Sequence, residues 1–436
     1  MGVFFGTDGL RGKVNVDLTF DVAYKCGNAL ATLKNRPTIL IGCDTRTTCS
    51  FLTCAFSAGA TNGGANVVDL GIVPTSGVAY LTRKLAVDFG VVVSASHNSK
   101  EYNGIKIFDK NGYKLGEKIE TELERNFIQN KVCTFEKIGK YSQRHRLVKD
   151  YQDFLQNTTN CTLSGLFVLL DCSNGASSRI SPKIFKNLGA KVKAFNTHCN
   201  GLDINENCGA LHPEKLAKKV VDLGADMGFA FDGDADRLIA VDHQGNVIDG
   251  DMVVLGIAKH WKDKGMLKGD KVVGTSHTNM GIEKQLNNFG IGLVRADIGD
   301  KYVLEKMLTQ NLVIGGEQSG HVILKDFHTT GDGILTALTL ANIVKTTHTT
   351  LNDVCFAKPF PQTNVNVEVG DKFKVMNNEN LAHEISKWSN FLGENGRLLI
   401  RASGTEPKIR VMVESNSQNE NQQIANCIVK LIEKIR

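Results

Sequence analysis

A serine and a histidine stand side by side in a short loop that follows an apolar run of the chain. Ser96 and His97 lie within residues 94–98, and Phe89–Val93 before them is typical of a buried strand. A serine hydroxyl becomes a useful carrier of phosphate when a base is nearby and cations receive the phosphate. The alternative is an ordinary hydrogen-bonded turn that closes the strand. Taken alone, the loop makes Ser96 a candidate site of phosphorylation.

Three carboxylates alternate along a second loop, which also follows an apolar run. Asp232, Asp234 and Asp236 are separated by small residues and followed by Arg237, so their oxygens can converge on one hard cation. An EF-hand is excluded, because its sixth position would be Arg237 and its twelfth His243. Asp236 also argues against an aspartyl-phosphatase loop, where threonine or valine is expected. The remaining alternative is a solvated acidic turn.

A third segment, residues 315–321, combines paired glycines with polar side chains. Glycine lets the backbone approach a ligand closely. Glu317 and Ser319 alternate, so in an extended loop both can point the same way, where they suit sugar hydroxyls or an amino group. A glycine-rich connection between strands is the alternative.

A fourth segment has the composition of a cradle for an anion. It contains hydroxyls, small residues and two arginines: Arg401, Ser403, Gly404, Thr405 and Arg410. Backbone N–H groups and arginines of this kind bind phosphate, although a Ser-Gly turn with surface arginines is also compatible. The four segments together predict phosphoryl transfer to a sugar phosphate.

Short β-rich runs alternate with helical stretches, which predicts layered α/β domains. In such sheets ligands bind beyond the carboxyl ends of strands, where these loops lie. We expect a hairpin from residues 105–108 and 113–115 around a central glycine, and a strand over residues 312–314. The predicted fold is α/β with four domains, three similar mixed-sheet domains and a smaller C-terminal α+β domain. Their predicted boundaries are 1–146 with the serine loop, 147–248 with the metal-binding loop, 249–357 with the sugar-binding loop, and 358–436 with the phosphate cradle.

Composition excludes several other classes of protein. Hydrophobic residues make up 42% and charged residues 22% of the 436 residues, which is ordinary for a globular chain. A net charge of +5 with no basic run interleaved with aromatics disfavours nucleic acid as a partner. The sequence shows no secretory signal and no bilayer-spanning apolar run. The eleven cysteines form no CxxC pair, so we expect reduced thiols and a cytoplasmic location.

These segments, in this order, resemble the α-D-phosphohexomutase family over the whole chain. The resemblance rests on residues 5–12, 96–98, 103–106, 232–236, 316–320 and 401–407. Gln318 resembles the bacterial branch that acts on glucosamine phosphates, whereas relatives that act on mannose and glucose phosphates tend to carry methionine there. The chain departs from the family at Ser99, where proline is usual, and at Lys301, where arginine is common. These departures concern the rigidity and local electrostatics of the serine loop.

The resemblance implies an isomerase that interconverts glucosamine 6-phosphate and glucosamine 1-phosphate, on the route to UDP-N-acetylglucosamine. It implies a phosphoserine at position 96, a 1,6-bisphosphate intermediate that also serves as activator, and one Mg²⁺ held by Ser96 and the three aspartates. The other implied roles are proton transfer by His97 and Lys106, electrostatic support from Arg11 and Arg237, sugar binding by Glu317 and Ser319, and binding of the distant phosphate by Arg401, Ser403, Gly404, Thr405 and Arg410.

Three rival activities stay open at the level of sequence. The same chemistry could act on mannose or glucose phosphates. A hydrolase could use Asp232 as its nucleophile, which would release phosphate steadily and label no serine. A non-catalytic sensor would bind a sugar phosphate without turnover. We expect no nucleic acid and no membrane as partners, and a homodimer is left open.

Overall fold

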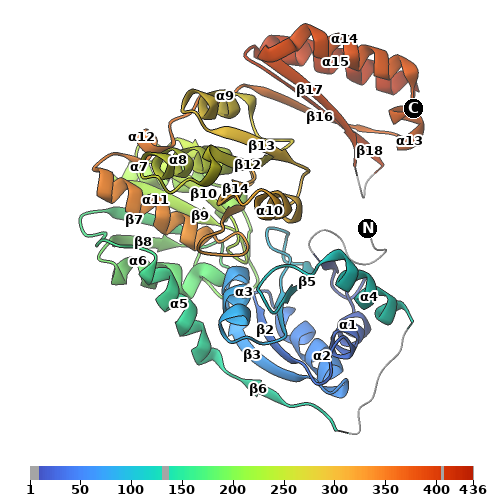
Figure 1. Ribbon diagram of the computed structural model, residues 1–436, viewed down its shortest axis with the longest axis vertical. Coiled ribbons are helices and arrows are strands. Elements are labelled where there is room, and N and C mark those ends of the chain that lie inside the picture. The colour runs from blue at the N-terminus through green and yellow to red at the C-terminus, as the bar shows by residue number, and fades with distance from the viewer. Residues whose placement is uncertain (1–8, 130–136, 404–406, 436) are drawn as a thin grey trace. The chain divides into compact units, whose positions relative to one another are not determined.

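The computed structural model describes residues 9–129, 137–403 and 407–435, and the chain forms two compact units. The first unit comprises Met1–His277 and Gly290–Phe356, and the second comprises Thr278–Phe289 and Ala357–Arg436. The first unit contains three sheets of mixed strand direction, and the second contains one antiparallel sheet (Figure 1). The four domain boundaries expected from the sequence stay predictions.

The first sheet carries the serine loop at the end of a central strand. Its strand order is β1-β5-β4-β2-β3-β6, in which β4, β2, β3 and β6 run parallel while β1 and β5 are antiparallel to their neighbours. The strands are β1 (Leu10–Lys13), β2 (Thr38–Cys43), β3 (Asn66–Ile72), β4 (Phe89–Val93), β5 (Tyr102–Asp109) and β6 (Tyr141–Gln143). The accompanying helices are α1 (Phe20–Thr32), α2 (Cys49–Asn62), α3 (Thr75–Lys84), α4 (Glu117–Ile128) and, after β6, α5 (Val148–Asn157).

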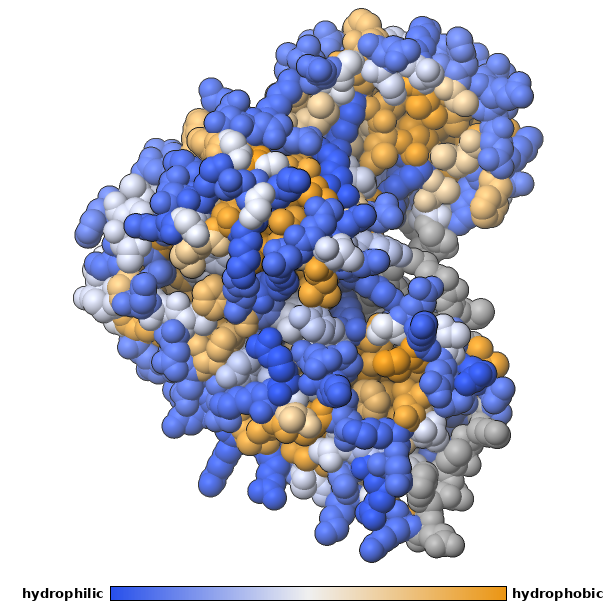
Figure 2. All heavy atoms as spheres, in the orientation of Figure 1, coloured by the Kyte–Doolittle hydropathy of each residue, from blue (hydrophilic) through white to orange (hydrophobic). Residues whose placement is uncertain are grey.

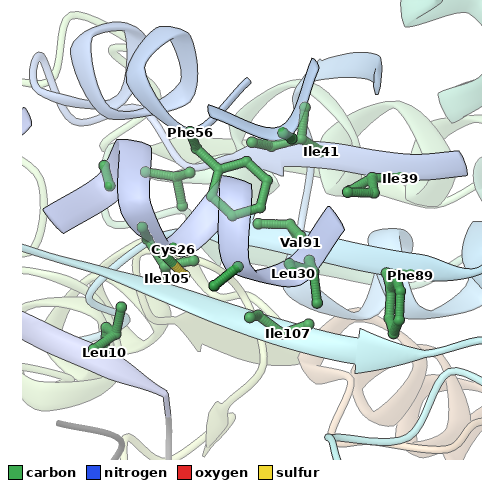
Figure 3. Close-up of a cluster of buried hydrophobic side chains, with 14 of the residues drawn as sticks. Leu10, Cys26, Leu30, Ile39, Ile41, Phe56, Phe89, Val91, Ile105 and Ile107 are labelled. Carbon is green, nitrogen blue, oxygen red and sulfur yellow. The ribbon is translucent and has the colours of Figure 1, made fainter. Parts of the chain in front are cut away.

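Side chains alternate between the two faces of this sheet, and different helices cover each face. Ile39 and Ile41 on β2 belong to one apolar cluster with Leu30 of α1 and Phe56 of α2 (Figure 3). Gly42, of the opposite parity, lies against side chains of α3 and its N-terminal approach. Successive residues of a strand point to opposite faces, so α1 and α2 cover one face and α3 the other. Helices on both faces make the β4 strand fully buried, which fixes the start of the serine loop.

The second sheet carries the acidic loop between two adjacent strands. Its order is β11-β10-β9-β7-β8, with β8, β7 and β9 parallel and β10 and β11 antiparallel. The strands are β7 (Phe167–Asp171), β8 (Lys191–Phe195), β9 (Met227–Phe231), β10 (Leu238–Asp242) and β11 (Val247–Ile248), and the helices are α6 (Ser181–Asn187) and α7 (Glu214–Leu223). Every residue of β9 and β10 is buried, so the turn between them has little freedom to move.

The third sheet has the order β13-β12-β14-β15, and only the β14–β15 pair is antiparallel. Its strands are β12 (Lys271–Thr275), β13 (Gly292–Ala296), β14 (Ile314–Gly316) and β15 (Val322–Leu324). The helices are α8 (Gly250–Asp263), α10 (Asp300–Thr309), α11 (Gly333–Thr347) and α12 (Leu351–Cys355). The loop with Glu317 and Ser319 connects β14 to β15.

The second unit contains a three-stranded sheet, β16-β18-β17, with helices against it. Its elements are α9 (Met280–Asn288), β16 (Gln362–Glu368), α13 (Lys372–Met376), α14 (Glu379–Leu392), β17 (Gly396–Ala402), β18 (Lys408–Ser415) and α15 (Gln418–Ile435). Hydrophobic residues gather on one part of this unit's surface in the view of Figure 2, and Phe373 and Phe391 are among its exposed apolar side chains.

Helix α9 comes from the middle of the sequence but packs with the C-terminal strands. The backbone N–H of Met280 donates to the buried Glu414 carboxylate (2.6 Å), and Arg397 donates both to that carboxylate and to the carbonyl of Thr278. Asn279 exchanges hydrogen bonds with the backbone of Phe360 (2.8 and 2.9 Å). These bonds satisfy the buried Glu414 charge from two separate parts of the chain.

A buried polar network joins three helices of the first unit. The hydroxyl of Tyr151 on α5 donates to the Asp332 carboxylate (2.9 Å) and lies 2.8 Å from the Ser76 hydroxyl on α3. Asp332 also accepts from the backbone N–H groups of Ile334 and Leu335, so it caps α11. Burial raises the pKa of Asp332 from 3.8 to about 6.

Asp332→Asn should stabilise the protein progressively, relative to the wild type, as the pH rises from about 4 to about 7. Between pH 3.8 and about 6 only the folded state keeps the Asp332 proton, so wild-type stability falls there as the pH rises. The amide oxygen keeps the cap without a charge, so the gain should reach roughly 3 kcal/mol at neutral pH. Urea unfolding of both proteins at several pH values tests this, with exposed Asp326→Asn as the matched change. A difference that does not vary with pH would contradict it.

The expected hairpin is present in its pairing, and one expected strand boundary was wrong. After β5 the chain turns back: the N–H of Asp109 donates to the carbonyl of Tyr113, the N–H of Leu115 donates to that of Ile107, and Lys114 forms an antiparallel bridge with Phe108, although residues 113–115 are too short to form a regular strand. The Asp109 carboxylate accepts the N–H groups of Asn111 and Tyr113, which closes the turn. The strand expected over residues 312–314 begins and ends two residues later, at β14, because Gly316 pairs with Val322 of β15 and so extends the strand toward the glycines.

In the described part of the chain, no helix has both the length and the apolar character needed to cross a membrane.

Candidate functional site

The Ser96 side chain points at the acidic loop of the neighbouring sheet. It follows β4, is 2% exposed, and its Oγ donates to Oδ2 of Asp232 at 2.6 Å. Nδ1 of His97 lies 3.3 Å from the same Oγ. Ser96 has a φ of 52°, in the left-handed region that serine rarely adopts. The fold therefore holds this hydroxyl between a carboxylate and an imidazole at some backbone strain.

The three predicted aspartates converge as a set. Asp232, Asp234 and Asp236 are all buried, and each offers one carboxylate oxygen within 4.8 Å of the others. Among the described residues, Oδ1 of Asp234 and Oδ1 of Asp236 have no hydrogen-bond partner. Buried carboxylate oxygens without donors are costly unless a cation lies between them. The residues present fit a hard divalent cation such as Mg²⁺, which prefers oxygen ligands.

Positive side chains surround the carboxylates. Lys106 on β5 is buried and donates to Asp234 (2.9 Å) and to Asp236 (3.1 Å). The backbone N–H of Arg237 donates to Oδ1 of Asp232 (3.1 Å), and its Nε lies 3.9 Å from Asp236. All of these groups belong to the first unit, and the fold brings the serine, the aspartates, Lys106 and Arg237 together.

Burial and the neighbouring charges together shift the pKa values of the site. Burial, followed by the Asp236 and Asp234 carboxylates, raises the pKa of Asp232 well above its usual value. For Asp236, burial acts in the same upward direction, but Lys106 and His321 outweigh it and hold its pKa well below the usual value. Burial, then the charges of Arg237 and Arg11, lowers the pKa of His97 to about 4. The imidazole is therefore neutral at pH 7, and Arg11, on β1 opposite Gly104, lies near enough to act on it.

The predicted sugar-binding residues lie beside the acidic loop. Gly320 follows Ser319 with a φ of 92° and packs so closely on β10 that a Cβ atom there would lie 2.3 Å from the carbonyl oxygen of Leu238. Burial raises the pKa of Glu317, and Arg237 is among the charges that act on it. Oγ of Ser319 is buried without a hydrogen-bond partner among the described residues.

Two further side chains contact the acidic loop and were not predicted. Thr75, at the start of α3, donates from Oγ1 to Oδ2 of Asp234 (2.5 Å), and its backbone N–H donates to the carbonyl of the same residue. His321 is buried with Nδ1 3.7 Å from Asp236, while its Nε2 accepts the N–H of Gly331. Both have a signal in the sequence: Thr75 follows a Val-Pro step at the start of a helix, and His321 ends the glycine-rich segment.

The predicted phosphate cradle lies in the second unit. Arg401 on β17 is directly opposite Arg410 on β18. Burial and the Arg410 charge lower the pKa of Arg401, and its Nε is buried without a hydrogen-bond partner in the described part of this unit. The backbone carbonyl of Ser403 accepts from Lys372 (2.7 Å). Gly404 and Thr405 lie outside the described residues. Adjacent arginines with an unused donor suit an anion.

Comparison with known sequences relates the whole chain to one protein family. The domain profiles of the phosphoglucomutase/phosphomannomutase family match in order: α/β/α domain I at residues 2–132, domain II at 149–245, domain III at 249–360, and the C-terminal domain at 365–431. The phosphoglucosamine mutase of Clostridium novyi is 44% identical over 445 residues, covering 100% of this chain and 99% of the relative. That of Caldanaerobacter subterraneus is 46% identical over 444 residues, with the same coverage.

Solved structures share the fold. A phosphoglucomutase/phosphomannomutase family protein from Burkholderia thailandensis has a TM-score of 0.84 at 22% identity, covering 99% of this chain and 98% of that one. The N-acetylphosphoglucosamine mutase of Aspergillus fumigatus, solved with GlcNAc-6P and magnesium, has a TM-score of 0.70 at 18% identity, covering 100% and 96%. The predicted class of three α/β domains and a C-terminal domain is confirmed. The chain belongs to the phosphoglucomutase/phosphomannomutase family of phosphohexomutases, and it is an isomerase.

Proposed function

We propose that this mutase interconverts glucosamine 6-phosphate and glucosamine 1-phosphate, and that the product feeds the synthesis of UDP-N-acetylglucosamine. The choice of sugar is supported by full-length identity of 44–46% to phosphoglucosamine mutases. Gln318 stands in the loop where the sequence resembles the branch that acts on glucosamine phosphates. The single observation that carries the chemistry is the Ser96 hydroxyl, held 2.6 Å from Asp232 beside three converging carboxylates.

The proposed reaction passes phosphate through Ser96 twice. In the first step the bond from phosphorus to Ser96 Oγ breaks and a bond to the free sugar hydroxyl forms, which gives a 1,6-bisphosphate. After the sugar turns, Ser96 Oγ attacks the other phosphate and loses its proton; the bond from that phosphorus to its sugar oxygen breaks, and the sugar oxygen takes up a proton, which releases the isomeric sugar monophosphate. Mg²⁺, held by Ser96 and the three aspartates, would neutralise the charge that builds on the phosphate during transfer.

Of the two residues predicted to transfer protons, His97 is better placed than Lys106 to accept the Ser96 proton in the return step. Its Nδ1 lies 3.3 Å from Oγ, and its ring is neutral at pH 7 because burial and two arginines lower its pKa. Lys106 is the other predicted residue for proton transfer. Its ammonium group donates hydrogen bonds to two carboxylates. This arrangement suits Lys106 to donate a proton to an oxygen rather than to accept one.

The remaining roles complete the proposal. Arg11 and Arg237 stabilise the phosphoserine, and Glu317 and Ser319 bind the sugar. Arg401, Ser403, Gly404, Thr405 and Arg410 bind the phosphate that is not reacting; Nε of Arg401, which has no hydrogen-bond partner among the described residues, supports this. A sugar 1,6-bisphosphate serves as activator. The cytoplasmic location and the homodimer stay predictions.

The geometry also bears on the rival hydrolase. Its nucleophile, Asp232, already accepts a hydrogen bond on each oxygen, from Ser96 and from the backbone of Arg237. Ser96 is therefore the better nucleophile of the two.

The test is intact mass of the protein before and after incubation with a sugar 1,6-bisphosphate, with rates on three sugar phosphates. We expect a gain of one phosphate that maps to Ser96, and a higher kcat/KM for glucosamine 6-phosphate than for glucose or mannose 6-phosphate. Steady release of phosphate with no gain in mass would identify a hydrolase. A preference for mannose 6-phosphate would overturn the choice of sugar.

A further inference from the structure

Two side chains from different sheets hold the same two carbonyl groups of the serine loop. Arg46, just after β2, donates from Nη2 to the carbonyls of Ser96 (3.0 Å) and Asn98 (2.8 Å). Asn205, in the loop after β8, donates from Nδ2 to the same two carbonyls (2.8 and 3.0 Å). Nη1 of Arg46 also donates to the carbonyl of Ser99. Three carbonyls of one short loop thus receive donors that the catalytic description above does not include.

Arg46 is itself fixed before it reaches the loop. Its Nε donates to Asp44 at 3.0 Å, and neither side chain is exposed to solvent. Asp44 also accepts from the Ser94 hydroxyl (2.6 Å), and that hydroxyl accepts the backbone N–H of Ser96 (2.9 Å). The Ser96 residue is therefore held at its N–H through Ser94 and Asp44, and at its carbonyl through Arg46 and Asn205.

Ser96 needs this support because its backbone is strained. A φ of 52° is unfavourable for a residue with a Cβ atom and persists only where the surroundings over-determine it. The acidic loop also approaches closely: a Cβ atom on Gly233 would lie 2.6 Å from the Ser96 carbonyl oxygen and 3.0 Å from Nδ2 of Asn205. The position of the Ser96 carbonyl is thus set jointly by the serine loop, the acidic loop and Asn205.

We propose that Arg46 and Asn205 are positioning residues that clamp the Ser96 loop from two sides, so that Oγ faces the aspartates through every turnover. The clamp rests on the proposed role of Ser96 as phosphate carrier. Neither residue touches the reacting atoms. Arg46 belongs to the first sheet and Asn205 to the second, so together they fix the phosphate-carrying loop against the sheet that holds the aspartates. A misplacement of about 1 Å at a reacting group typically costs about a hundredfold in rate.

Asn205→Ala and Arg46→Lys test the clamp in the full-length enzyme. Asn205→Ala removes the donors from one side, and Arg46→Lys keeps the charge but loses the planar fork. We expect kcat to fall by about 10–100-fold in each variant, with KM for the sugar phosphate within about threefold of wild type. Saturating sugar 1,6-bisphosphate should still load phosphate onto Ser96, and the melting temperature of Asn205→Ala should stay within a few degrees of wild type.

The matched control is Glu206→Gln. Glu206 forms an exposed ion pair with Lys100 (3.3 Å), which joins the same two segments without touching the carbonyls. We expect this variant to keep wild-type kcat. A wild-type kcat in Asn205→Ala would overturn the proposal. Parallel losses of kcat, substrate binding and melting temperature would also overturn it, because they would show a structural role alone.

Hydrogen exchange separates failure of the clamp from failure of the proposed function. We expect amides in the peptide that spans residues 94–99 to exchange at least about tenfold faster in Asn205→Ala than in wild type or Glu206→Gln. This measurement needs no substrate and no phosphate. If wild type gains no phosphate on Ser96, the proposed function fails; if exchange at residues 94–99 is unchanged, the clamp fails.

Discussion

Ser96→Ala should lower mutase turnover by at least about 10⁴-fold while leaving the fold intact. Removal of a covalent nucleophile typically costs several orders of magnitude, because no other group can carry the phosphate between the two positions of the sugar. Ser96 Oγ is the hydroxyl that contacts Asp232 and His97. Its backbone hydrogen bonds do not depend on the side chain, so the loop should keep its shape.

The measurement is turnover with saturating sugar 1,6-bisphosphate, together with intact mass. The alanine variant should gain no phosphate at any bisphosphate concentration. Ser94→Ala is the matched control: the Ser94 hydroxyl is occupied by Asp44 and the Ser96 N–H, so this variant should turn over more slowly but still gain phosphate. If Ser96→Ala keeps more than a few per cent of activity, Ser94 becomes the candidate carrier.

Exhaustive removal of divalent cations should abolish turnover, and Asp234→Asn should lower it by at least about 10³-fold even at high Mg²⁺. Oδ1 of Asp234 is buried with no donor among the described residues, which suits it to bind a cation. A bound cation supplies several kcal/mol of charge stabilisation in phosphoryl transfer, and each 1.4 kcal/mol is about tenfold in rate. Zn²⁺ should support catalysis poorly, since it prefers fewer and softer ligands.

The metal dependence is read from kcat/KM against free Mg²⁺ and, separately, from the rise in melting temperature that Mg²⁺ causes. Asp242→Asn is the matched control, because Asp242 is an equally buried carboxylate at the far end of β10 that closes a turn. It should show wild-type dependence on Mg²⁺. Undiminished turnover after chelation would remove the metal from the mechanism.

The sequence predicted the parts of the site that are local in the chain. Ser96 follows β4, Asp232 follows β9, and Glu317 follows β14, so the rule that ligands bind beyond strand ends located all three loops. Contacts between residues that are close in the sequence, such as Ser96 and His97, also lie within single motifs. Such contacts can be inferred from the types and spacing of the residues in one loop.

The missed contacts are those between distant segments. Thr75 and Asp234 are 159 positions apart, and Ser96 and Asn205 are 109 positions apart, so neither spacing nor periodicity relates them. The association of α9 with the C-terminal strands was missed for the same reason. The hairpin after β5, in contrast, is local: residues 113–115 pair back onto β5, and the Asp109 carboxylate closes the turn by accepting the N–H groups of Asn111 and Tyr113.

Helix α9 has a consequence for how this chain can be recombined with those of its relatives. A fragment or chimaera cut at residue 357 would separate α9 from the strands it packs on. Glu414, which is fully buried, would then lose the N–H of Met280 but keep its bond to Arg397, and Arg397 would lose the carbonyl of Thr278. A buried carboxylate deprived of a donor is destabilising by several kcal/mol. The smallest unit that can be exchanged between relatives is therefore discontinuous in the sequence. Residues 278–289 and residues 357–436 must be taken together from the same parent protein.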